Sequence, residues 1–441
     1  MMSSTKNGAN QRRLTHDSLR TPQMRRILAS SFIGSAIEFY DFMLYAAASA
    51  LVFAHVFFSD LDPAIATVAS FATLAAGYVA RPLGGIIFGH FGDRLGRKGV
   101  LVVTMITMGI GTALIGVLPT YEQVGVIAPL MLVSLRVIQG FAVGGEWGGA
   151  MLIALEQAPA GKRGFAASFA NLGAPAGSIL SAGMLSLFSL LPSEQFLSWG
   201  WRIPFLASFV LVLIGLFIRL KVVESPLFVE LSAKAEERRI PLLRVLTKSP
   251  RVLILGVLVA MSQLTISGMV SVWGLSYATS QGADSTFALD SKVFSAIAMF
   301  VTAILAARLS DKWGRRPVIA FGIILAIIFA YPALLLISSG ENWFFALAVV
   351  LAQGIQGVIL GPLAAFLAEL FPTGVRFTGS SVAFQGASAI GAGFTPILAS
   401  TFVAAGGVML LGAAWIVVLV ICGTALLIAP EGRRRDLATI S

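Results

Sequence analysis

Long apolar runs separated by short polar breaks make up most of this sequence of 441 residues. About 20 largely apolar residues are enough for a helix to span the hydrocarbon core of a membrane. Charged residues and turn formers mark the breaks, for example at 59–63 and 339–342. The runs predict twelve membrane-spanning helices, with approximate limits at 27–57, 64–91, 99–118, 125–157, 164–191, 200–220, 251–279, 292–307, 317–338, 342–371, 377–404 and 407–429.

The composition agrees with this pattern. Hydrophobic residues make up 57% of the chain and charged residues 12%, whereas soluble domains carry about 25% charged residues. A membrane β-barrel would show short alternating segments, and the apolar runs here are long and continuous. The sequence therefore predicts an all-α polytopic membrane protein. Its single cysteine, Cys422, excludes an intramolecular disulfide.

The basic residues indicate how the chain is oriented. Of the 31 Lys and Arg residues, 27 fall in the two tails and the even-numbered breaks. Because cytoplasmic loops carry an excess of Lys and Arg, both termini are expected in the cytoplasm. The net charge of +10 then faces anionic membrane lipid, and nucleic-acid binding has no further support. The expected location is the plasma (inner) membrane, with multiple passes and a retained N-terminal tail.

A long polar stretch divides the chain into two halves. The expected units are a tail (1–26), a six-helix bundle (27–220), a cytoplasmic linker with a helix (221–250), a second six-helix bundle (251–429) and a tail (430–441). The halves also share sequence. The segment GDRLGRK at 92–98 recurs as SDKWGRR at 310–316, and Glu156, Arg163 and Ser168 recur as Glu369, Arg376 and Ser381. Repeated six-helix halves are typical of transporters that rock about a central site.

Several motifs resemble those of a known family. Residues 89–98 (GHFGDRLGRK) resemble the signature loop of the major facilitator superfamily, and 136–140 (RVIQG) resemble its second motif. Four stretches resemble the metabolite:proton symporters, which include shikimate, 2-oxoglutarate, citrate and proline/betaine carriers. These stretches are 38–42 (EFYDF), 81–85 (RPLGG), 140–149 (GFAVGGEWGG) and 199–205 (WGWRIPF). The resemblance implies the major facilitator fold, with 12 transmembrane helices in two six-helix pseudo-repeats.

The signature loop is expected to act as a gate. Asp93 and Arg97 stand one helical turn apart, so a charge network there could hold helix ends together in one state and release them in the other. The competing interpretation is a set of positive-inside anchors. The second copy has Ala307 where the family pattern has its first glycine, which would weaken it as a gate. The residues expected to contribute to gating are Gly89, Asp93, Arg94, Gly96, Arg97, Asp311 and Arg315.

Five of the ionisable residues inside predicted spans stand out, because burial of such a residue is costly and points to function. They are Glu38, Asp41, Arg81, Arg136 and Glu146. At about 1.5 Å per residue, three of them lie near the middle of the membrane. Glu38, Asp41 and Tyr45 share one helical face, and Arg136, Gln139 and Glu146 share another, which predicts a common polar cavity.

Three acids and two bases cannot be fully paired, although single ion pairs such as Glu38 with Arg81 remain a structural alternative. We therefore expect Glu38, Asp41 and Glu146 to take part in proton coupling.

The expected substrate is anionic. An arginine offers a planar fork that matches a carboxylate, so Arg81 is assigned the substrate carboxylate, with Arg136, Tyr45 and Gln139 as further binding residues. Lys292 is expected at the outer end of its helix, where a substrate contact is less favoured. The C-terminal half otherwise offers uncharged polar groups, which are Gln263, Tyr277, Gln353, Gln356 and Gln385.

Catalytic constellations, metal-ligand spacings and a phosphate-binding loop are absent from the sequence, so we expect no enzyme activity and no cofactor. The energy source would be a proton gradient. The favoured function is proton-coupled import of a small organic acid by alternating access, by a monomer. The alternatives are a proton-antiport exporter and a symporter of zwitterions such as betaine or proline. A channel or receptor agrees less well with the repeated halves.

Overall fold

The computed structural model describes residues 22–95, 97–144, 151, 154–155, 158, 160–220, 245–247, 249–372 and 375–432. For 22–23, 26–27, 86, 89–95, 97–98, 100–101, 160, 218–220 and 377 it describes the backbone alone. Every regular element in these described ranges is helical. The predicted helix in the linker lies outside the described residues.

Helices of the first half follow the predicted apolar runs. Their bounds are α2 Pro22–Leu51, α3 Phe53–Phe57, α4 Pro63–Leu95, α5 Arg97–Ile115, α6 Tyr121–Val124, α7 Ile127–Val143, η1 Ala160–Lys162, α9 Arg163–Asn171, α10 Gly173–Ser189, α11 Ser193–Gln195, η2 Phe196–Gly200 and α12 Arg202–Leu220. The second half comprises α15 Pro250–Ile266, η3 Ser267–Trp273, α16 Gly274–Ser280, α17 Ser285–Trp313, α18 Arg315–Ser338, α19 Asn342–Leu370, α20 Arg376–Ser388, η5 Ala389–Phe394 and α21 Thr395–Ile428.

The described part of the chain contains eight helices that are long and apolar enough to cross a membrane. One of them, Thr378–Ile428, folds back on itself at Gly406 and Gly407, so it holds two spans. The φ of +70° at Gly407 is a backbone conformation that favours glycine. With the two shorter apolar helices and α2, the described segments give the twelve expected spans. The boundary expected at Gly406–Gly407 is confirmed.

One predicted span is too short. The sequence places helix 8 at 292–307, whereas α17 runs from Ser285 to Trp313. Polar residues at both ends of α17 lower its hydropathy without breaking the helix. Asp284 caps its N-terminus, because the Asp284 carboxylate accepts a hydrogen bond of 2.7 Å from the Phe287 backbone N–H. Lys292 therefore lies seven residues inside α17, and its expected place at the outer end of the helix is wrong.

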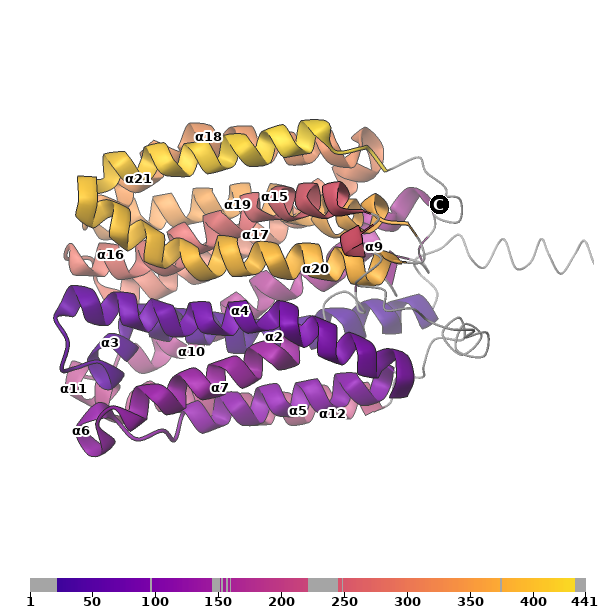
Figure 1. Ribbon diagram of the computed structural model, residues 1–441. Helices are drawn as coiled ribbons and strands as arrows, with labels where there is room; N and C mark the ends of the chain where they lie inside the picture. Colours follow the sequence, from indigo (N-terminus) through magenta and orange to yellow (C-terminus); the bar gives the residue numbers. More distant parts are fainter. Residues whose placement is uncertain are drawn as a thin grey trace, which may run out of the picture.

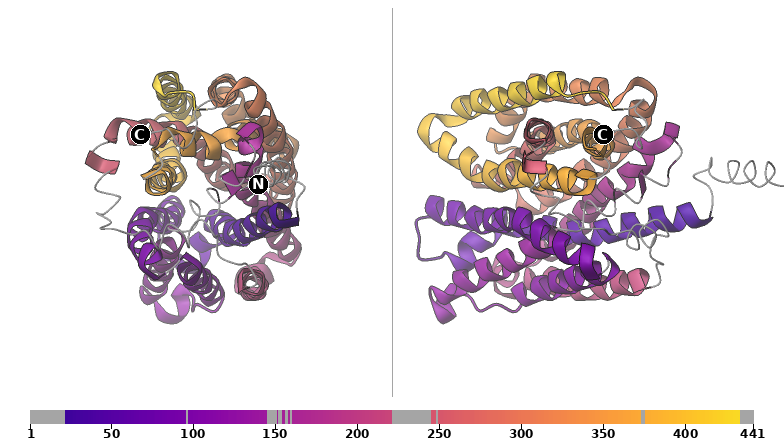
Figure 2. Two further views of the ribbon diagram at one scale, coloured as in Figure 1. Left: turned by 90° about the vertical axis from the view of Figure 1, so that its right-hand side faces the viewer. Right: turned by 45° about the vertical axis from the view of Figure 1, so that its right-hand side comes forward.

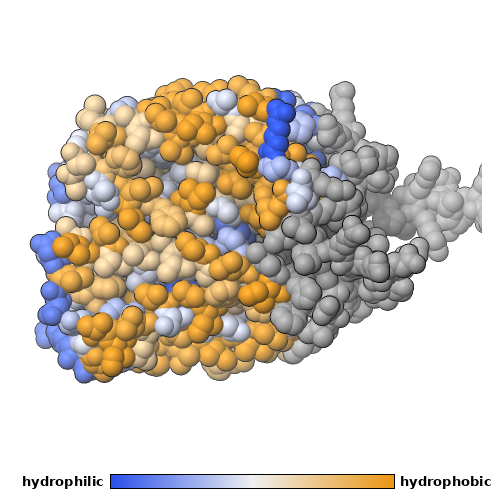
Figure 3. Space-filling view, in the orientation of Figure 1, coloured by the Kyte–Doolittle hydropathy of each residue, from blue (hydrophilic) through white to orange (hydrophobic). Residues whose placement is uncertain are grey.

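The helices run roughly parallel to one another, with the first half and the second half side by side (Figure 1). We call the end that carries Pro22 and Ile428 the terminal end, and the end that carries Ser285 and Asn342 the loop end. The left view of Figure 2 shows the bundle end-on. Apolar side chains cover the face shown in Figure 3, and hydrophilic residues gather at the loop end, near α6 and α11. This apolar belt is what a membrane-embedded bundle requires.

Glycines let neighbouring helices approach to backbone contact. A Cβ added at Gly84 of α4 would lie 1.9 Å from the Phe141 carbonyl oxygen of α7. A Cβ at Gly361 of α19 would lie 2.3 Å from the Ala303 carbonyl oxygen of α17. Such contacts fix the position of α4 and α17, which both line the candidate site.

Substitution of Gly84 by alanine tests this close packing. The added methyl group meets rigid backbone, so we expect Gly84→Ala to lower the free energy of unfolding by about 1–3 kcal/mol. Thermal unfolding in detergent measures the change. Gly183→Ala is the matched control, because a Cβ there meets no atom within 4 Å and alanine is the better helix former. Equal stability of the two variants would contradict the packing argument.

Candidate functional site

A small cavity lies between the two halves. Its volume is about 40 Å³, which is room for about three water molecules. The first half contributes residues from α2, α4, α9 and α10, and the second half contributes the rest. The lining residues are Phe39, Met43, Tyr78, Arg81, Asn171, Ala174, Ser178, Gln263, Leu264, Ser267, Ser271, Met299, Gln353, Gln356, Leu360, Phe384, Ser388 and Ala392. We call this space the central cavity.

Side-chain amides line the cavity on the side of the second half. Gln356 Nε2 donates to Gln263 Oε1 at 2.8 Å, and Gln353 Nε2 donates to the Ser271 hydroxyl. Gln356 Oε1 is buried and has no hydrogen-bond partner among the described residues. Buried polar atoms are rarely left without a partner. This acceptor is therefore suited to a hydroxyl or N–H group of a ligand.

Arg81 brings a positive charge to the cavity from α4. Its side chain is 4% exposed, and its Cζ lies 3.6 Å from the centre of the Phe42 ring and 4.3 Å from that of Tyr78. Aromatic faces attract cations at such distances. Arg81 Nε has no hydrogen-bond partner among the described residues. The guanidinium is thus held in place by rings while a donor stays unused.

Arg136 lies deeper in the first half and does not line the central cavity. Its Cζ is 4.1 Å from the Phe42 ring centre and 4.0 Å from the Tyr45 ring centre. Arg136 Nη1 donates to Gln139 Oε1 at 3.3 Å, and Gln139 Nε2 donates to the Thr112 hydroxyl at 2.7 Å. Arg136, Gln139 and Tyr45 therefore form one buried polar cluster inside the first bundle.

The two acids of α2 face a different space. Glu38 and Asp41 line a void of about 10 Å³ together with Met105, Met108 and Val212. Thr112 and Arg136 are polar groups near Asp41, but neither carboxylate oxygen of Asp41 has a well-formed hydrogen bond within the described residues. Glu38 lies close enough to Arg81 to act on its charge. The two predicted polar faces do meet, since Arg136 lies against Tyr45 and near Asp41, but they form a packed cluster that is separate from the central cavity lined by Arg81.

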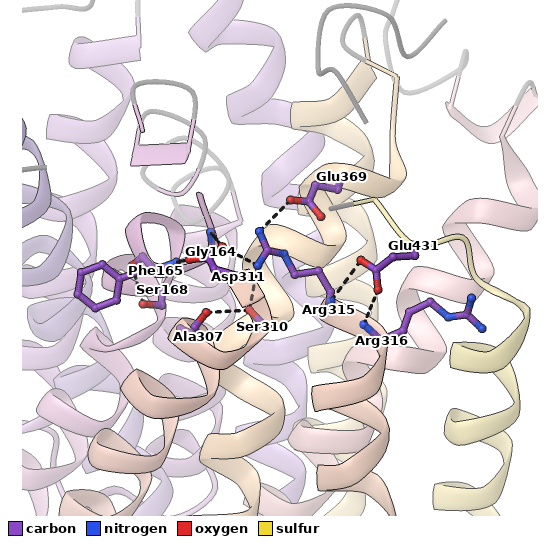
Figure 4. Close-up of polar contacts among 10 residues, drawn as sticks. All are labelled: Gly164, Phe165, Ser168, Ala307, Ser310, Asp311, Arg315, Arg316, Glu369 and Glu431. Carbon is purple, nitrogen blue, oxygen red and sulfur yellow. Dashed lines mark hydrogen bonds and ion pairs between the residues drawn. The ribbon is translucent and has the colours of Figure 1, made fainter. Parts of the chain in front are cut away.

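The second signature copy joins the two halves at the terminal end (Figure 4). The Asp311 carboxylate at the end of α17 accepts hydrogen bonds from the backbone N–H groups of Gly164 (2.9 Å) and Phe165 (3.0 Å). These groups belong to the first turn of α9, whose N-terminus favours negative charge. Asp311 therefore caps a helix of the other half, and we call this contact the terminal latch.

A chain of ionic contacts extends the terminal latch within the second half. Arg315 Nη1 lies 2.7 Å from Asp311 Oδ1, and Arg315 Nη2 lies 3.2 Å from Glu369 Oε1. Glu431 accepts from the backbone N–H of Arg315 at 3.2 Å and of Arg316 at 2.9 Å. The ends of α17, α18, α19 and the segment after α21 are thereby joined.

A second group of contacts joins the halves at the loop end. The Ser186 hydroxyl of α10 donates to the Asp290 carboxylate of α17, and the Ser189 hydroxyl donates to the Thr286 hydroxyl at 2.9 Å. We call these the loop-end contacts. The same two spans, formed by α9 with α10 and by α17, are thus connected at both ends while the cavity between the halves stays small.

The first signature copy can be compared only by position. Gly89, Asp93 and Arg94 lie at the end of α4 and Arg97 at the start of α5, but their side chains are outside the described residues. Gly96 and Glu146 lie outside the described residues altogether. The relative strength of the two copies therefore stays a prediction. Ala307 in the second copy is fully buried, next to the close contact between α17 and Gly361.

Several cavity residues had no sequence signal of their own. Phe39 and Met43 are close in sequence to the acids Glu38 and Asp41 of α2, but unlike these acids they line the central cavity. Asn171 of α9 lines the cavity and donates through Nδ2 to the Leu360 carbonyl oxygen at 2.9 Å, across the two halves. Ser267 and Ser271 lie in the π-helical turns of η3. An uncommon π-turn often marks a functional site, but its position is not readable from residue types.

Known proteins resemble this chain along most of its length. The Major Facilitator Superfamily profile matches residues 31–376 and 293–438. The inner membrane metabolite transport protein YhjE of Escherichia coli (strain K12) is 42% identical over 88% of this chain and 90% of its own length. The shikimate transporter of the same organism is 39% identical over 86% of this chain and 88% of its own length.

Two further similarities come from a more distant transporter and a solved structure. The proline/betaine transporter of Escherichia coli (strain K12) is 32% identical over 91% of this chain and 82% of its own length. The structure of the proton:xylose symporter XylE has a TM-score of 0.74 at 19% identity, and the match covers 94% of this chain and 98% of that one. This second similarity concerns the fold alone.

Weakening the terminal latch should make the central cavity more accessible from the terminal side, and weakening the loop-end contacts should make it more accessible from the loop side. A reporter cysteine, Ser178→Cys, lines the cavity. Asp311→Asn removes the charge that caps α9, so impermeant maleimide should label the reporter several-fold faster from the terminal side. Ser186→Ala should speed labelling from the loop side. The two rates are measured in vesicles that expose either the terminal side or the loop side to the reagent.

Two matched substitutions control for loss of charge and of a hydroxyl. Asp62→Asn changes an exposed acid, and Ser134→Ala removes a hydroxyl that bonds only within its own helix, to the Leu130 carbonyl oxygen. Neither should alter labelling. If Asp311→Asn also leaves the terminal-side rate unchanged, the latch does not control access.

Proposed function

The chain belongs to the Major Facilitator Superfamily, and we propose that it imports a small organic acid together with protons by alternating access. Family membership makes it a multi-pass membrane transporter of a small molecule and not an enzyme. A proton gradient would supply the energy without a cofactor. The proposed substrate class rests on the charge of the central cavity.

One observation carries the choice of an anion. Arg81 is the only charged side chain among the described residues that line the central cavity. An arginine inside a membrane span needs a counter-charge in each state of the cycle. A carboxylate on the substrate can supply it through two parallel hydrogen bonds. The relative named as a shikimate transporter supports a carboxylate substrate.

The first half also offers a route for proton coupling. Glu38 lies near enough to Arg81 to stabilise its charge when no substrate is bound. A proton on Glu38 would release Arg81 for the substrate carboxylate, so binding and protonation would favour each other. Asp41 lies near Arg136 and has no well-formed hydrogen bond in the described part of the chain. It is the second proposed proton carrier.

The proposed orientation follows from the placement of basic residues. The terminal end would face the cytoplasm of a cell whose inner membrane holds the protein, as the relative named an inner membrane transport protein suggests. The terminal latch would then be the cytoplasmic gate, and the loop-end contacts the outer gate. Each gate would open in turn, and a monomer contains both.

A zwitterionic substrate is the second candidate. The relative named as a proline/betaine transporter is 32% identical to this chain. Tyr78 and Phe39 line the central cavity beside Arg81, and aromatic faces bind quaternary ammonium groups. Binding of betaine with an affinity equal to that of carboxylates would favour this candidate.

The charge assignment can be tested at Arg81. Arg81→Lys keeps the charge and loses the planar fork, so we expect carboxylate binding to weaken by at least tenfold. Isothermal titration with shikimate, 2-oxoglutarate and citrate in turn measures this, and the active ligand should bind more tightly at mildly acidic pH. Arg202→Lys is the control, because Arg202 donates to the Gly116 and Leu118 carbonyl oxygens outside the cavity. If an uncharged sugar binds tightly and its affinity is the same in Arg81→Lys, the anion site is ruled out.

Proton coupling can be tested at the acids of α2. Glu38→Gln and Asp41→Asn keep the side-chain shape and remove the titrating group. We expect each to abolish pH-driven accumulation in proteoliposomes while some substrate exchange persists, because exchange needs no net proton movement. Glu122→Gln, at an exposed site in α6, should change neither. If both α2 variants still concentrate substrate when protons flow inward, the coupling group lies elsewhere.

A further inference from the structure

Lys292 is a buried cation for which the proposed transport cycle has not yet given a role. It lies seven residues inside α17, and its side chain is 3% exposed. A lysine at such a place is costly within a membrane span. Residues near a helix end can extend their charge to the membrane surface, but this side chain is covered by protein.

Lys292 has no ionic or hydrogen-bonded partner among the described residues. No salt bridge, side-chain hydrogen bond or aromatic contact of its ammonium group is found among these residues. Arg315 on the neighbouring helix α18 contrasts with it, since Arg315 contacts two carboxylates. A structural role would call for a partner of this kind, so the missing partner points to a ligand that comes and goes.

The helical register places Lys292 on the cavity side of α17. Met299 lines the central cavity and stands seven residues further along the helix. Seven residues return to nearly the same face, about 20° away. Lys292 therefore lies about 10 Å nearer to the loop end than Met299. The buried Ser295 stands between them on the same face.

The loop-end contacts lie between Lys292 and the loop end of α17. Thr286 and Asp290 precede Lys292 on α17 and contact Ser189 and Ser186 of α10. Asp290 is two residues away, about 200° around the helix, and accepts its hydrogen bond from Ser186. Helical side chains lean towards the N-terminus of their helix, which for α17 is the loop end. Lys292 therefore faces away from α10, and only a wider opening of the loop end, in which the two halves separate, would uncover its ammonium group.

We propose that Lys292 is an anion-capture site, which binds the substrate carboxylate as the loop end opens and before it reaches Arg81. The site rests on the proposed import of an organic anion. Lys292 provides the charge at the approach to the cavity, and Arg81 provides it at the centre. A point charge with three rotatable donors suits a transient contact, whereas the arginine fork suits the oriented one.

Uptake kinetics test the capture site. The probes are shikimate, 2-oxoglutarate and citrate, each applied from the loop side of proteoliposomes. For the transported probe we expect Lys292→Met to raise KM about tenfold with little change in the maximal rate. Lys292→Arg should stay within about twofold of the parent protein. Lys312→Met, at an exposed site on the same helix, should leave KM unchanged.

Thermal stability separates capture from a structural role. Removal of an unpaired buried cation relieves a desolvation cost, so Lys292→Met should unfold at the same or a higher temperature without substrate. A lower unfolding temperature with unchanged KM would identify a structural lysine and overturn the proposal.

Chemical labelling gives a third measurement. An impermeant thiosulfonate should modify Lys292→Cys from the loop side, faster in the Ser186→Ala background, and the transported carboxylate should slow it. An absence of both effects would contradict the proposed position on the path. If Arg81→Lys weakens carboxylate binding and Lys292→Met leaves KM unchanged, only this inference fails. If the protein transports only uncharged solutes, the proposed function fails with it.

Discussion

A basic side chain at the centre of a membrane-spanning helix costs about 2.5–3.5 kcal/mol, and this chain holds several basic side chains within its helical bundle. Each is accommodated differently. Arg202 donates to two backbone carbonyl oxygens near the loop end. Arg136 stacks on aromatic rings and bonds to Gln139. Arg81 Nε, and Arg136 Nε and Nη2, nevertheless have no hydrogen-bond partner in the described part of the chain, and no salt bridge to Lys292 is found there. The cost that the fold leaves uncompensated is therefore spread over the central cavity, the buried cluster around Arg136, and Lys292 of α17.

Charged groups also determine how strongly the two halves are held together at each end. At the terminal end, the Asp311 carboxylate accepts hydrogen bonds from two backbone N–H groups of the other half. Hydrogen bonds to charged groups contribute about 1.5–3 kcal/mol, against about 0.5–1.5 kcal/mol for neutral ones. The loop end has one bond to the Asp290 carboxylate and a neutral hydroxyl pair. This arrangement therefore holds the terminal end more strongly, and opening that end would need the additional free energy of substrate and proton binding.

The sequence was a good guide to the helices and a partial guide to the site. Apolar runs identify spans because every backbone group inside a membrane must be hydrogen-bonded within its own helix. Helix 8 was underestimated because Asp290, Lys292 and Asp311 lower the hydropathy of a segment that stays helical. In α2, periodicity grouped Glu38 with Asp41 correctly but could not show which face meets the other half. Phe39, one residue and about 100° away, lines the cavity instead.

The division of polar groups between the halves bears on how transport could be coupled to protons. The first half brings a permanent cation to the cavity, and the second half brings glutamine and serine side chains that carry no charge. Amides and hydroxyls can exchange partners for water or substrate at small cost, because each both donates and accepts. Arg81 cannot exchange its partners at small cost, because its positive charge persists in every state of the cycle. When the substrate leaves, a carboxylate such as that of Glu38 must take its place, and that carboxylate can do so only after losing its proton. Under the proposed cycle, proton release follows from the need to neutralise one arginine.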